Sequence, residues 1–523
     1  MEHVQGAFGV VDWLVMGLYV AAMLAIGAVS SRRQAGVDSF FLGGRTMPGW
    51  AVALSVLATS LSAATFIGAP EISYRGDLSY LILNIGGMIA AFVVAFLFVP
   101  PLYRAGTVTI YGYLGKRFGK PSMIAASAMF LLGRLLASGA RLFIAAIAFS
   151  LILYGDTGRR DLVAAILLFG GIGTVYTVSG GIRAVIWTDT VQIAVVVFVA
   201  GLSVYLLLDS IPLSASEIVA ALRDVDGHDK LSVLDTRFEW GLPYTLWTGV
   251  IASTFVSTAS YGTDHDMAQR MMTGKSAWRG GAALIASTAL GIPVICLFLA
   301  IGLLLSIYYG RPDLMQDAAP SDAVTQTMKI YPQFLLNHLP AGIRGLAMAG
   351  VFAAAMSSFD SAINAMASTA VADLYMPWRA WRRRAALDAG ENTPAESLRA
   401  PRLAVLLMAA VLTCFAILAV FMQEEGGGTL IDFALGVMAF AHAPLLGVFS
   451  AALFTRRGNT ASVIGALVVG VAGVLLLQSY MLPKLFGFEL AWPWWWVIVS
   501  PVSFGVCLLG KTTPVRPAPR QDA

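Results

Sequence analysis

LATSLSAATFIGAP, residues 57–70, is the stretch from which the fold of this sequence is inferred. It lies inside an apolar segment that begins near Trp50, and its centre carries four hydroxyl side chains and no charge: Thr59, Ser60, Ser62 and Thr65. Hydroxyls crowded into two turns, followed by a glycine and a proline, are typical of a broken membrane helix whose freed carbonyls face a cavity. Ion binding is one interpretation. The alternative is that these side chains pack membrane helices together and bond to their own backbone carbonyls.

The composition places the whole chain in the membrane. Hydrophobic residues make up 58% of its 523 residues, charged residues only 12%, and the mean hydropathy is +0.76. These values predict a polytopic protein embedded in a lipid bilayer rather than a soluble fold. The net charge of +4 gives no indication of nucleic acid as a partner. The three cysteines have spacings that fit neither a metal site nor a disulfide framework.

Apolar segments long enough to cross a bilayer recur thirteen times along the chain. They run over residues 10–29, from about 50 onward, 80–103, 123–153, 162–178, 184–207, 244–261, 282–308, 345–375, 403–422, 430–454, 462–480 and 493–509. We therefore predict an all-α polytopic membrane protein with about 13 transmembrane helices.

Loop charge predicts the orientation of these spans. Arginine and lysine gather in alternate loops, at residues 32–45, 116–120, 183, 270–279, 379–384 and 456–457, and again at 511 in the tail. Because cytoplasmic loops carry the excess of basic residues, the N-terminus is predicted outside and the C-terminus in the cytoplasm. The expected location is a plasma membrane, which in a bacterium is the inner membrane. The sequence predicts no particular oligomeric state.

A second hydroxyl-rich segment, STFVSTASYGTD at residues 253–264, lies five spans after the first. The two segments therefore cross the membrane in opposite directions, as an inverted five-helix repeat with a central solute site requires. The predicted division has five parts: an extra N-terminal helix and inner loop (1–47), a first repeat (48–207), an outer loop (208–240), a second repeat (241–455), and two C-terminal helices with a cytoplasmic tail (456–523). The outer segments 209–239 and 310–340 are expected to hold short surface helices.

The segment 345–375 carries the strongest single signal for ion binding. Its Ala354, Ser357, Ser358 and Ser361 lie within two turns, so that a carbonyl and hydroxyls can converge on one point. Sodium is a hard cation that prefers a small cage of oxygens, and the first broken helix could supply the missing ones. Close helix packing through small residues is the alternative.

Ionisable residues inside spans cost on the order of 2.5–3.5 kcal/mol each at a helix centre, so each one indicates a function or a partner. Four occur: Arg134, Arg141, Asp189 and Asp360. The two arginines are seven residues apart and share one helix face, where either could bind a carboxylate bidentately or form a structural ion pair. The aspartates could bind a cation or pair with an arginine. For the lone His442, packing and proton coupling are both open.

No nucleotide-binding fingerprint and no hydrolase or zinc-protease motif occurs, so the sequence predicts a protein that is not an enzyme. Transport is the expected function. Two alternatives stay open: proton-coupled transport through Asp189, Asp360 or His442, and a membrane sensor built on a transporter scaffold. A channel has no support, because nothing resembles a selectivity filter.

Five ordered motifs resemble the sodium:solute symporter family: FFLGGRTMPGWAVALSVLATSLSAATFIGAP (40–70), GYLGKRFG (112–119), YTVSGGIRAVIWTDTVQ (176–192), GTDHDMAQR (262–270) and AAAMSSFDSAINAMASTAVADLY (353–375). The resemblance covers about residues 40–454. It implies a leucine-transporter-like inverted five-helix repeat preceded by one extra helix. It also implies a sodium-coupled symporter that imports a small organic solute by alternating access, with Na⁺ as the coupling ion.

The resemblance further implies a sodium site. Carried over residue by residue, its ligands are the carbonyls of Ala58, Leu61 and Ala354 and the hydroxyls of Ser357 and Ser358. Members with a second sodium ion match this chain at Asp189, Ser357, Asp360 and Ser361. The sialic acid transporters of the family have a serine where this chain has Asp360, which leaves the number of coupled ions open.

The expected solute also follows from the resemblance. Sugar-binding members have Glu and Gln where this chain has Ala64 and Thr65, which argues against a galactose-type site. The substrate contacts of sialic acid transporters map onto six positions: Ser60, Ser62, Thr65, Tyr80, Asn84 and Arg134. Arg134 is expected to hold a carboxylate. The predicted solute is therefore a carboxylate or other organic anion such as sialic acid.

Overall fold

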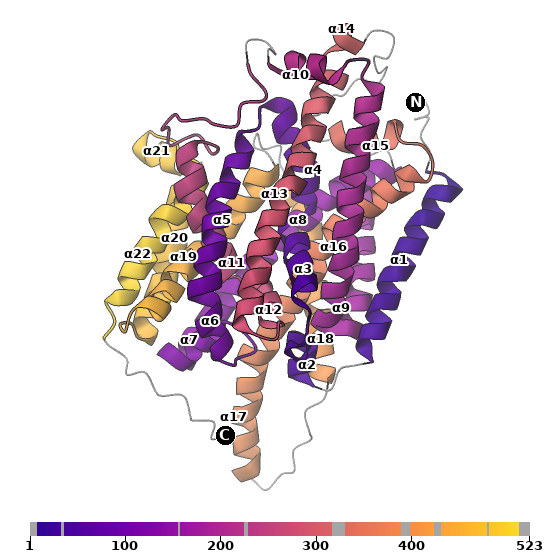
Figure 1. Ribbon diagram of the computed structural model, residues 1–523. Helices are drawn as coiled ribbons and strands as arrows, with labels where there is room; N and C mark the ends of the chain where they lie inside the picture. The colour runs from indigo at the N-terminus through magenta and orange to yellow at the C-terminus, as the bar shows by residue number, and fades with distance from the viewer. Residues whose placement is uncertain are drawn as a thin grey trace.

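The computed structural model describes residues 8–32, 36–154, 157–223, 228–315, 330–388, 398–422, 430–478 and 481–511. The predicted cytoplasmic tail beyond residue 511 and the first seven residues lie outside this range. Within it the backbone is helical almost throughout, and one isolated β-bridge joins Met47 to Gly274. The helices stand side by side in one elongated bundle (Figure 1).

The helix bounds are as follows. The first half contains α1 (Val10–Ser31), α2 (Val37–Leu42), η1 (Gly43–Arg45), α3 (Gly49–Ser60), α4 (Ala63–Arg75), η2 (Ser79–Ile82), α5 (Leu83–Val93), the π-helical η3 (Val94–Phe98), α6 (Val99–Arg104), α7 (Tyr111–Phe118), α8 (Lys120–Tyr154), α9 (Arg159–Ser210) and α10 (Ala215–Arg223). The second half contains the π-helical η4 (Thr248–Ala252), α11 (Ser253–Gly262), α12 (His265–Met272), α13 (Ala277–Tyr308), α14 (Pro312–Met315), α15 (Ile330–Asn337), α16 (Ile343–Thr369), the π-helical η7 (Ala370–Tyr375), α17 (Met376–Asp388), α18 (Arg399–Met422) and α19 (Leu430–Phe454). The chain ends with α20 (Thr460–Leu477), α21 (Leu482–Phe486) and α22 (Pro493–Leu508).

The described helices confirm an integral membrane fold. Nine of them are long and apolar enough to cross a bilayer, or ten when α3 and α4 count as one bent span. At 1.5 Å per residue, the 52 residues of α9 would extend roughly 78 Å, far more than a bilayer core of about 30 Å. The chain instead kinks at Gly181, where φ is 54° and a Cβ would lie 2.5 Å from the Phe40 carbonyl oxygen. This kink separates the two predicted spans at 162–178 and 184–207.

Both hydroxyl-rich segments contain a break, as predicted. The axes of α3 and α4 differ by 60°, and Leu61 between them has extended backbone angles. The second break lies at Thr263 and Asp264, between α11 and α12. Each break exposes helix ends within the bundle, so backbone carbonyls and amides become available there.

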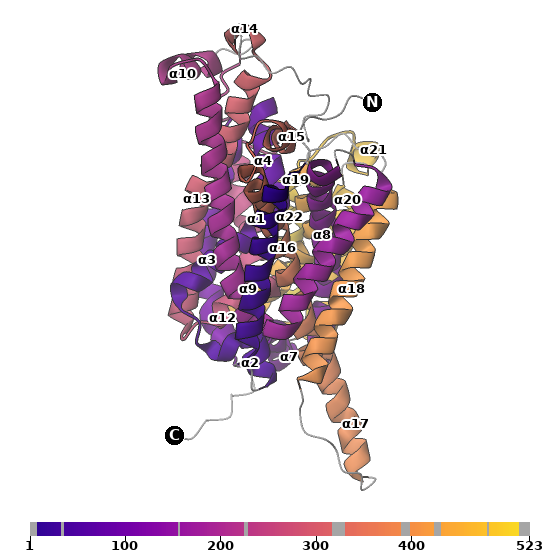
Figure 2. The same cartoon turned by 90° about the vertical axis from the view of Figure 1, so that its right-hand side faces the viewer.

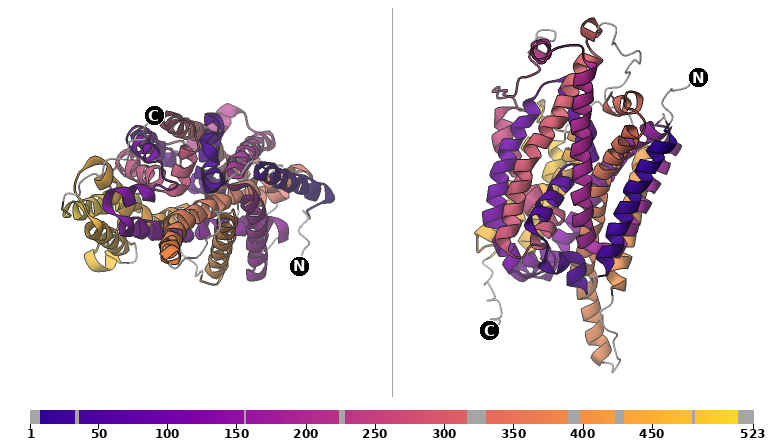
Figure 3. Two further views of the ribbon diagram at one scale, coloured as in Figure 1. Left: turned by 90° about the horizontal axis from the view of Figure 1, so that it is seen from below. Right: turned by 45° about the vertical axis from the view of Figure 1, so that its right-hand side comes forward.

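Helix α16 forms the centre of the bundle. Within its most apolar stretch, 94% of the residues are buried. It packs against α1, α3, α4, α8, α9 and α18. Seen end-on, α1 in indigo and the yellow C-terminal helices α20–α22 lie at opposite edges of the bundle (Figure 3). The hydroxyls of α16 are therefore enclosed by protein and face no lipid.

The two ends of the bundle differ in the elements that cover them. Helices α10, α14 and α21 lie at one end, and α2, α7 and α17 at the other, where α17 projects away from the bundle (Figures 1 and 2). The predicted short helices in 209–239 and 310–340 are confirmed as α10, α14 and α15. Residues 224–227 and 316–329 of these segments lie outside the described residues. Helix α15 departs from the expected surface position, because its apolar side chains Ile330, Tyr331 and Phe334 are buried.

A lysine from the loop after α10 holds the end of α4. The buried Lys230 donates from Nζ to the carbonyl oxygens of Tyr74, at 2.7 Å, and Gly76, at 3.1 Å. A positive charge at a helix C-terminus satisfies carbonyls that have no intrahelical partner. Burial lowers the pKa of this ammonium group below its usual value, and the charge of Asp77 opposes that effect.

Helix α5 packs closely against η4 and α11 at Gly86, and a substitution there tests this packing. In Gly86→Ala, the new Cβ would lie 2.4 Å from the Gly249 carbonyl oxygen and 2.6 Å from the Thr254 amide nitrogen. We expect a loss of about 1–3 kcal/mol of stability, because backbone on both sides must move. Thermal unfolding of the purified protein measures it. The control is Gly201→Ala in α9, where no atom lies within 4 Å of the added Cβ. Equal unfolding temperatures for the two variants would contradict the packing described.

Candidate functional site

A cavity of about 200 Å³ lies where the two helix breaks meet. Its lining comes from α3, α4, η2, α5, α8, α11 to α13 and α19, together with Trp492 at the start of α22. The polar lining side chains are Thr59, Ser60, Thr65, Tyr80, Asn84, Arg134, Arg141, Ser253, Ser257, Ser260, Tyr261, Asp264, Ser287, Thr288 and Trp492. A concave site with convergent polar groups between helices of a bundle is where a transporter binds its solute.

Five of the six predicted solute contacts line this cavity: Ser60, Thr65, Tyr80, Asn84 and Arg134. The sixth, Ser62, is buried at the N-terminus of α4 and does not belong to the lining. The hydroxyl of Ser60 donates to the Val56 carbonyl oxygen at 2.9 Å, which leaves its lone pairs available toward the cavity. The six positions therefore form one neighbourhood around the first break.

Helix α11 contributes a row of hydroxyls that the sequence analysis did not assign to the solute. Ser253, Ser257 and Ser260 follow one another at helical spacing, so they lie on one face, and all three line the cavity. Ser253 donates to the Leu83 carbonyl oxygen at 2.6 Å and so also ties α11 to α5. The cavity is thus hydroxyl-rich on two sides, from the broken helix pair α3–α4 and from α11.

Arg134 is buried at the edge of the cavity and is paired with two carboxylates. Its Nη1 lies 2.8 Å from Asp264 Oδ2, and its Nη2 donates to Asp266. Any solute carboxylate would compete with these internal partners. His442 also faces Asp264, with 3.3 Å between Nε2 and Oδ2. The histidine that the sequence left open therefore lies beside the solute cavity, next to an acid.

Arg141 lines the same cavity but has a different environment. Its Nη2 lies 3.1 Å from the sulfur of Met438 in α19. Among the described residues no carboxylate lies within ion-pairing distance of it. A thioether is a weak acceptor, whereas a guanidinium carries five N–H donors. Arg134 and Arg141 lie on the same face of α8, but Arg134 pairs with two carboxylates and Arg141 contacts a thioether.

The five predicted ligands of the main sodium site are all buried and lie on facing helices. Ala58 and Leu61 flank the end of α3, and Ala354, Ser357 and Ser358 belong to α16, which packs against α3 and α4. The backbone bonds formed across the break go to the carbonyls of Leu57 and Ser62. The carbonyls of Ala58 and Leu61 accept none of these bonds. These two carbonyls beside the break are therefore available to a cation, while on α16 the Ser358 hydroxyl donates to the Ala354 carbonyl oxygen at 3.5 Å.

The predicted second sodium site is connected to an arginine. Asp189 is completely buried and accepts hydrogen bonds from Ser357, at 2.7 Å, and from Ser55, at 2.5 Å. Arg270 Nη2 lies 3.1 Å from Asp189 Oδ2 and donates to the Ser361 hydroxyl as well. Asp360 accepts from the Tyr176 hydroxyl at 2.7 Å and from Ser361 at 3.4 Å. The guanidinium of Arg270 thus lies between Asp189 and Ser361, two of the four ligands predicted for the second sodium ion.

Helix α12 carries the residues that sequence reasoning missed. The sequence analysis assigned Arg270 to an inner basic loop, and this was wrong, because Arg270 and every other residue of α12 are buried. Asp266 pairs with both Arg134 and Arg270. The segment GTDHDMAQR did carry a signal. Asp266 and Arg270 are four residues apart, directly after a hydroxyl-rich apolar helix, which is the spacing of a pair on one helix face.

Charge links the solute cavity to the sodium ligands. Arg134, Asp266, Arg270 and Asp189 form a continuous chain of ion pairs, and Asp189 bonds to Ser357. The two guanidinium groups of this cluster pair with three carboxyl groups, from Asp189, Asp264 and Asp266, and a fourth, from Asp360, bonds to Ser361 beside Arg270. With all four ionised the cluster has an excess of negative charge. Buried charge must be balanced, so the cluster favours a bound cation or bound protons.

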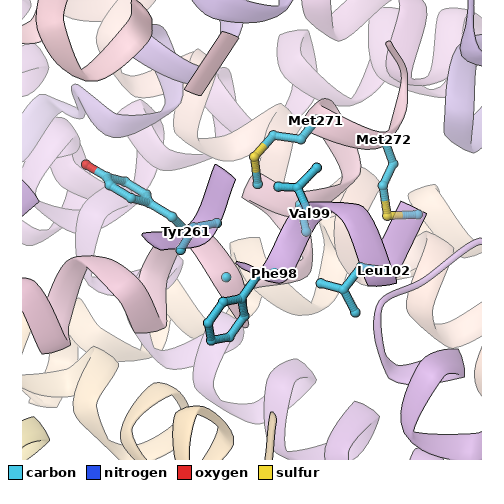
Figure 4. A pocket seen from close by; sticks show the side chains of 9 residues that line it. Phe98, Val99, Leu102, Tyr261, Met271 and Met272 are labelled. Carbon is cyan, nitrogen blue, oxygen red and sulfur yellow. The ribbon is translucent and has the colours of Figure 1, made fainter. Parts of the chain in front are cut away.

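A second, much smaller cavity of about 10 Å³ lies beneath the main one. It is lined by apolar side chains of η3, α6 and α12, and Tyr261 belongs to both cavities. In Figure 4 the Tyr261 hydroxyl points away from Phe98, Val99 and Met271. A void this small and apolar stays dry and holds no solute. Of these two cavities, the larger one has room for a solute.

Known proteins resemble this chain in sequence and in fold. The family model for the sodium:solute symporter family matches residues 40–473. The sodium/sialic acid symporter of Proteus mirabilis is 29% identical over 469 residues, which cover 90% of this chain and 89% of that protein. The sodium-coupled monocarboxylate transporter 2 of Danio rerio is 30% identical over 479 residues, covering 90% and 72%. A solved sodium-coupled sialic acid symporter, substrate-bound and outward-open, aligns with a TM-score of 0.80 at 26% identity over 96% of this chain and 98% of that chain.

Proposed function

Because the chain belongs to the sodium:solute symporter family, we propose that it imports a small organic anion together with sodium by alternating access. Sodium-coupled symport and the leucine-transporter-like fold follow from family membership and from the likeness to the solved symporter. The solute class is the part that we propose. The observation that carries it is one cavity with two arginines and a hydroxyl-rich wall, next to the predicted sodium ligands.

We propose that the main sodium site consists of the carbonyls of Ala58, Leu61 and Ala354 with the hydroxyls of Ser357 and Ser358. Five neutral oxygens suit a monovalent cation, and the nearby Asp189 adds negative charge without being a required ligand. Sodium here would bridge α16 to the break between α3 and α4. Because Ser60 and Thr65 flank the same break, sodium binding orders that wall of the solute cavity.

A second sodium ion, bound by Asp189, Ser357, Asp360 and Ser361, requires Arg270 to move. Its guanidinium bonds to both Asp189 and Ser361 in this structure. A sodium ion placed between them would meet a fixed positive charge a few ångströms away. We therefore propose that one sodium ion binds in this conformation, and that a second binds only after Arg270 withdraws.

The names of two relatives support the proposed solute class. Sialic acid and monocarboxylates, which the relatives' names give as their substrates, share a carboxylate group. In this chain we propose that Ser60, Thr65, Tyr80 and Asn84 bind the polar body of such a solute. Ser62 lies at the break, where its carbonyl oxygen accepts hydrogen bonds from the backbone amides of Thr65 and Phe66. Arg134, the expected carboxylate ligand, pairs with Asp264 and Asp266, and these pairs limit its direct contact with the anion.

We propose the plasma membrane, the inner membrane of a bacterium, as the location, with the first helix starting outside. Lys116 and Arg117 in α7 and Arg379 and Arg382 in α17 lie at the same end of the bundle (Figure 1), which supports a cytoplasmic position for that end. We also retain 48–207 and 241–455 as the two inverted repeats, since each contains one of the two broken helices.

Uptake into liposomes tests the coupling. With purified protein and labelled sialic acid or lactate, we expect accumulation when sodium is higher outside and none when potassium replaces it. An inside-negative potential should increase uptake, because each net charge moved across 100 mV contributes about 2.3 kcal/mol. Accumulation driven by a pH gradient without sodium would contradict the mechanism and favour proton coupling through the His442–Asp264 pair.

A further inference from the structure

One of the two arginines in the solute cavity, Arg141, has no contact assigned to it in the proposed function. Arg134 and Arg141 are both on α8 and both line the cavity, about 10 Å apart along the helix axis. Because α8 starts at the end occupied by α7, Arg141 lies nearer the opposite end, which is the proposed outer one (Figure 1). The two side chains therefore present charge at two levels of one cavity.

The inner arginine is already neutralised. Arg134 pairs with Asp264 and Asp266, so its guanidinium has two carboxylate partners. A solute carboxylate that bound there would have to displace an internal carboxylate and leave it buried without its pair. Leaving one charge of a buried pair without its partner is strongly unfavourable. Arg134 is therefore a poor direct ligand for an incoming anion in this conformation.

Arg141, the outer arginine, has no carboxylate partner among the described residues. The one hydrogen bond recorded for Arg141 goes to the Met438 sulfur, at 3.1 Å, and among the described residues it forms no ion pair. A charged side chain inside a membrane protein normally has a partner, and a guanidinium fork matches a carboxylate with two parallel hydrogen bonds. What the site lacks is an acceptor with two oxygens.

The surroundings of Arg141 indicate what else the solute carries. The hydroxyls of Ser257 and Ser260 on α11, and those of Ser60 and Thr65 at the first break, line the same cavity. Leu57, Leu61 and Ile295 provide apolar wall between these polar groups. A solute that satisfies both kinds of surface has hydroxyl or amide groups on a compact carbon frame, with the carboxylate at one end.

From these contacts we propose that Arg141 binds the carboxylate of the transported solute directly, while Arg134 positions α12 through its ion pairs. The assignment rests on the proposed function and deepens it. The solute class is a small hydroxylated carboxylate whose acid group points toward the outer end of the cavity. Displacement of Met438 from the guanidinium lets the carboxylate form its two hydrogen bonds.

The test compares a carboxylate with its neutral derivative. Sialic acid and its methyl ester are added to the purified wild type and to Arg141→Gln, and thermal stabilisation is measured with and without sodium. We expect Arg141→Gln to weaken the apparent affinity for sialic acid at least tenfold, to leave the weak binding of the ester unchanged and to keep the stabilisation by sodium alone. Arg141→Lys should restore part of the affinity. The matched control is Arg402→Gln, a half-buried arginine on α18 that is not part of the cavity lining.

Each outcome decides the assignment. Affinity for sialic acid within twofold of wild type in Arg141→Gln overturns it. So does a wild type that binds only the ester or other neutral solutes, although sodium symport would stand in that case. If sodium has no effect on the wild type but sialic acid binding is still lost in Arg141→Gln, the proposed coupling fails and the role of Arg141 is supported. Because sodium alone should still stabilise the variant, that measurement also shows that it is folded.

Discussion

Arg270→Met is expected to be among the most damaging single substitutions in this protein, costing about 3–5 kcal/mol of stability and abolishing uptake. Arg270 is completely buried, pairs with Asp189 and Asp266, and donates to Ser55 and Ser361. Methionine fills a similar volume but leaves Asp189 without a positive partner and Asp266 with Arg134 alone, in a medium of low dielectric constant. Thermal unfolding in detergent gives the loss of stability, and liposome uptake gives the loss of transport.

The matched control is Arg237→Met. Arg237 also pairs with an aspartate, Asp235, but its side chain is 65% exposed. An exposed pair contributes roughly 0–1 kcal/mol, so this variant should unfold and transport as the wild type does. Similar effects of the two substitutions would contradict the buried ion-pair chain as a support of the fold. Arg270→Lys, which retains the charge but not the planar fork, should give an intermediate result.

Replacing Ser357 and Ser358 together by alanine is expected to raise the sodium concentration for half-maximal uptake at least tenfold, which corresponds to about 1.4 kcal/mol of lost sodium binding. Two of the five proposed oxygen ligands disappear, while the small side chains keep the helix packing of α16 nearly intact. Sodium-dependent uptake over a range of sodium concentrations measures the shift. Stabilisation of the purified protein by sodium should weaken in parallel.

Ser306→Ala serves as the control for this pair. Ser306 is a buried serine in the membrane helix α13, and its hydroxyl donates to the Leu303 carbonyl oxygen of its own helix at 2.7 Å. It should leave the sodium dependence unchanged. An unchanged sodium dependence in the Ser357 and Ser358 double variant as well would remove these hydroxyls from the sodium site and leave the family-based coupling without its proposed ligands.

Much of the architecture could be predicted, because membrane spans and helix breaks depend on residues that are close together in the sequence. Apolar length predicts spans, and hydroxyls followed by glycine and proline predicted the break that separates α3 from α4 by 60°. The division of α9 into two spans was predicted by apolar length, whereas the kink at Gly181 that divides it was found only in the structure. The cluster of Ser357, Ser358 and Ser361 was visible because helical spacing alone places them on neighbouring positions of one helix. Their role as sodium ligands stays a prediction.

The sequence by itself thus determined the membrane class and the broken helices, and it named the small set of residues that we propose as cation ligands. Only the tertiary structure decided which charges pair. Arg134 meets Asp264 across 130 residues of chain, Ser55 meets Asp189 across 134, and Arg270 meets Asp189 across 81. Spacing along the helix accordingly could not separate Arg134 from Arg141, and only the family resemblance singled out Arg134. Arg270 was predicted to lie in a loop. The energy of an ion pair depends on the distance between the groups and on how far packing excludes water from them, and neither quantity is set by spacing along the chain.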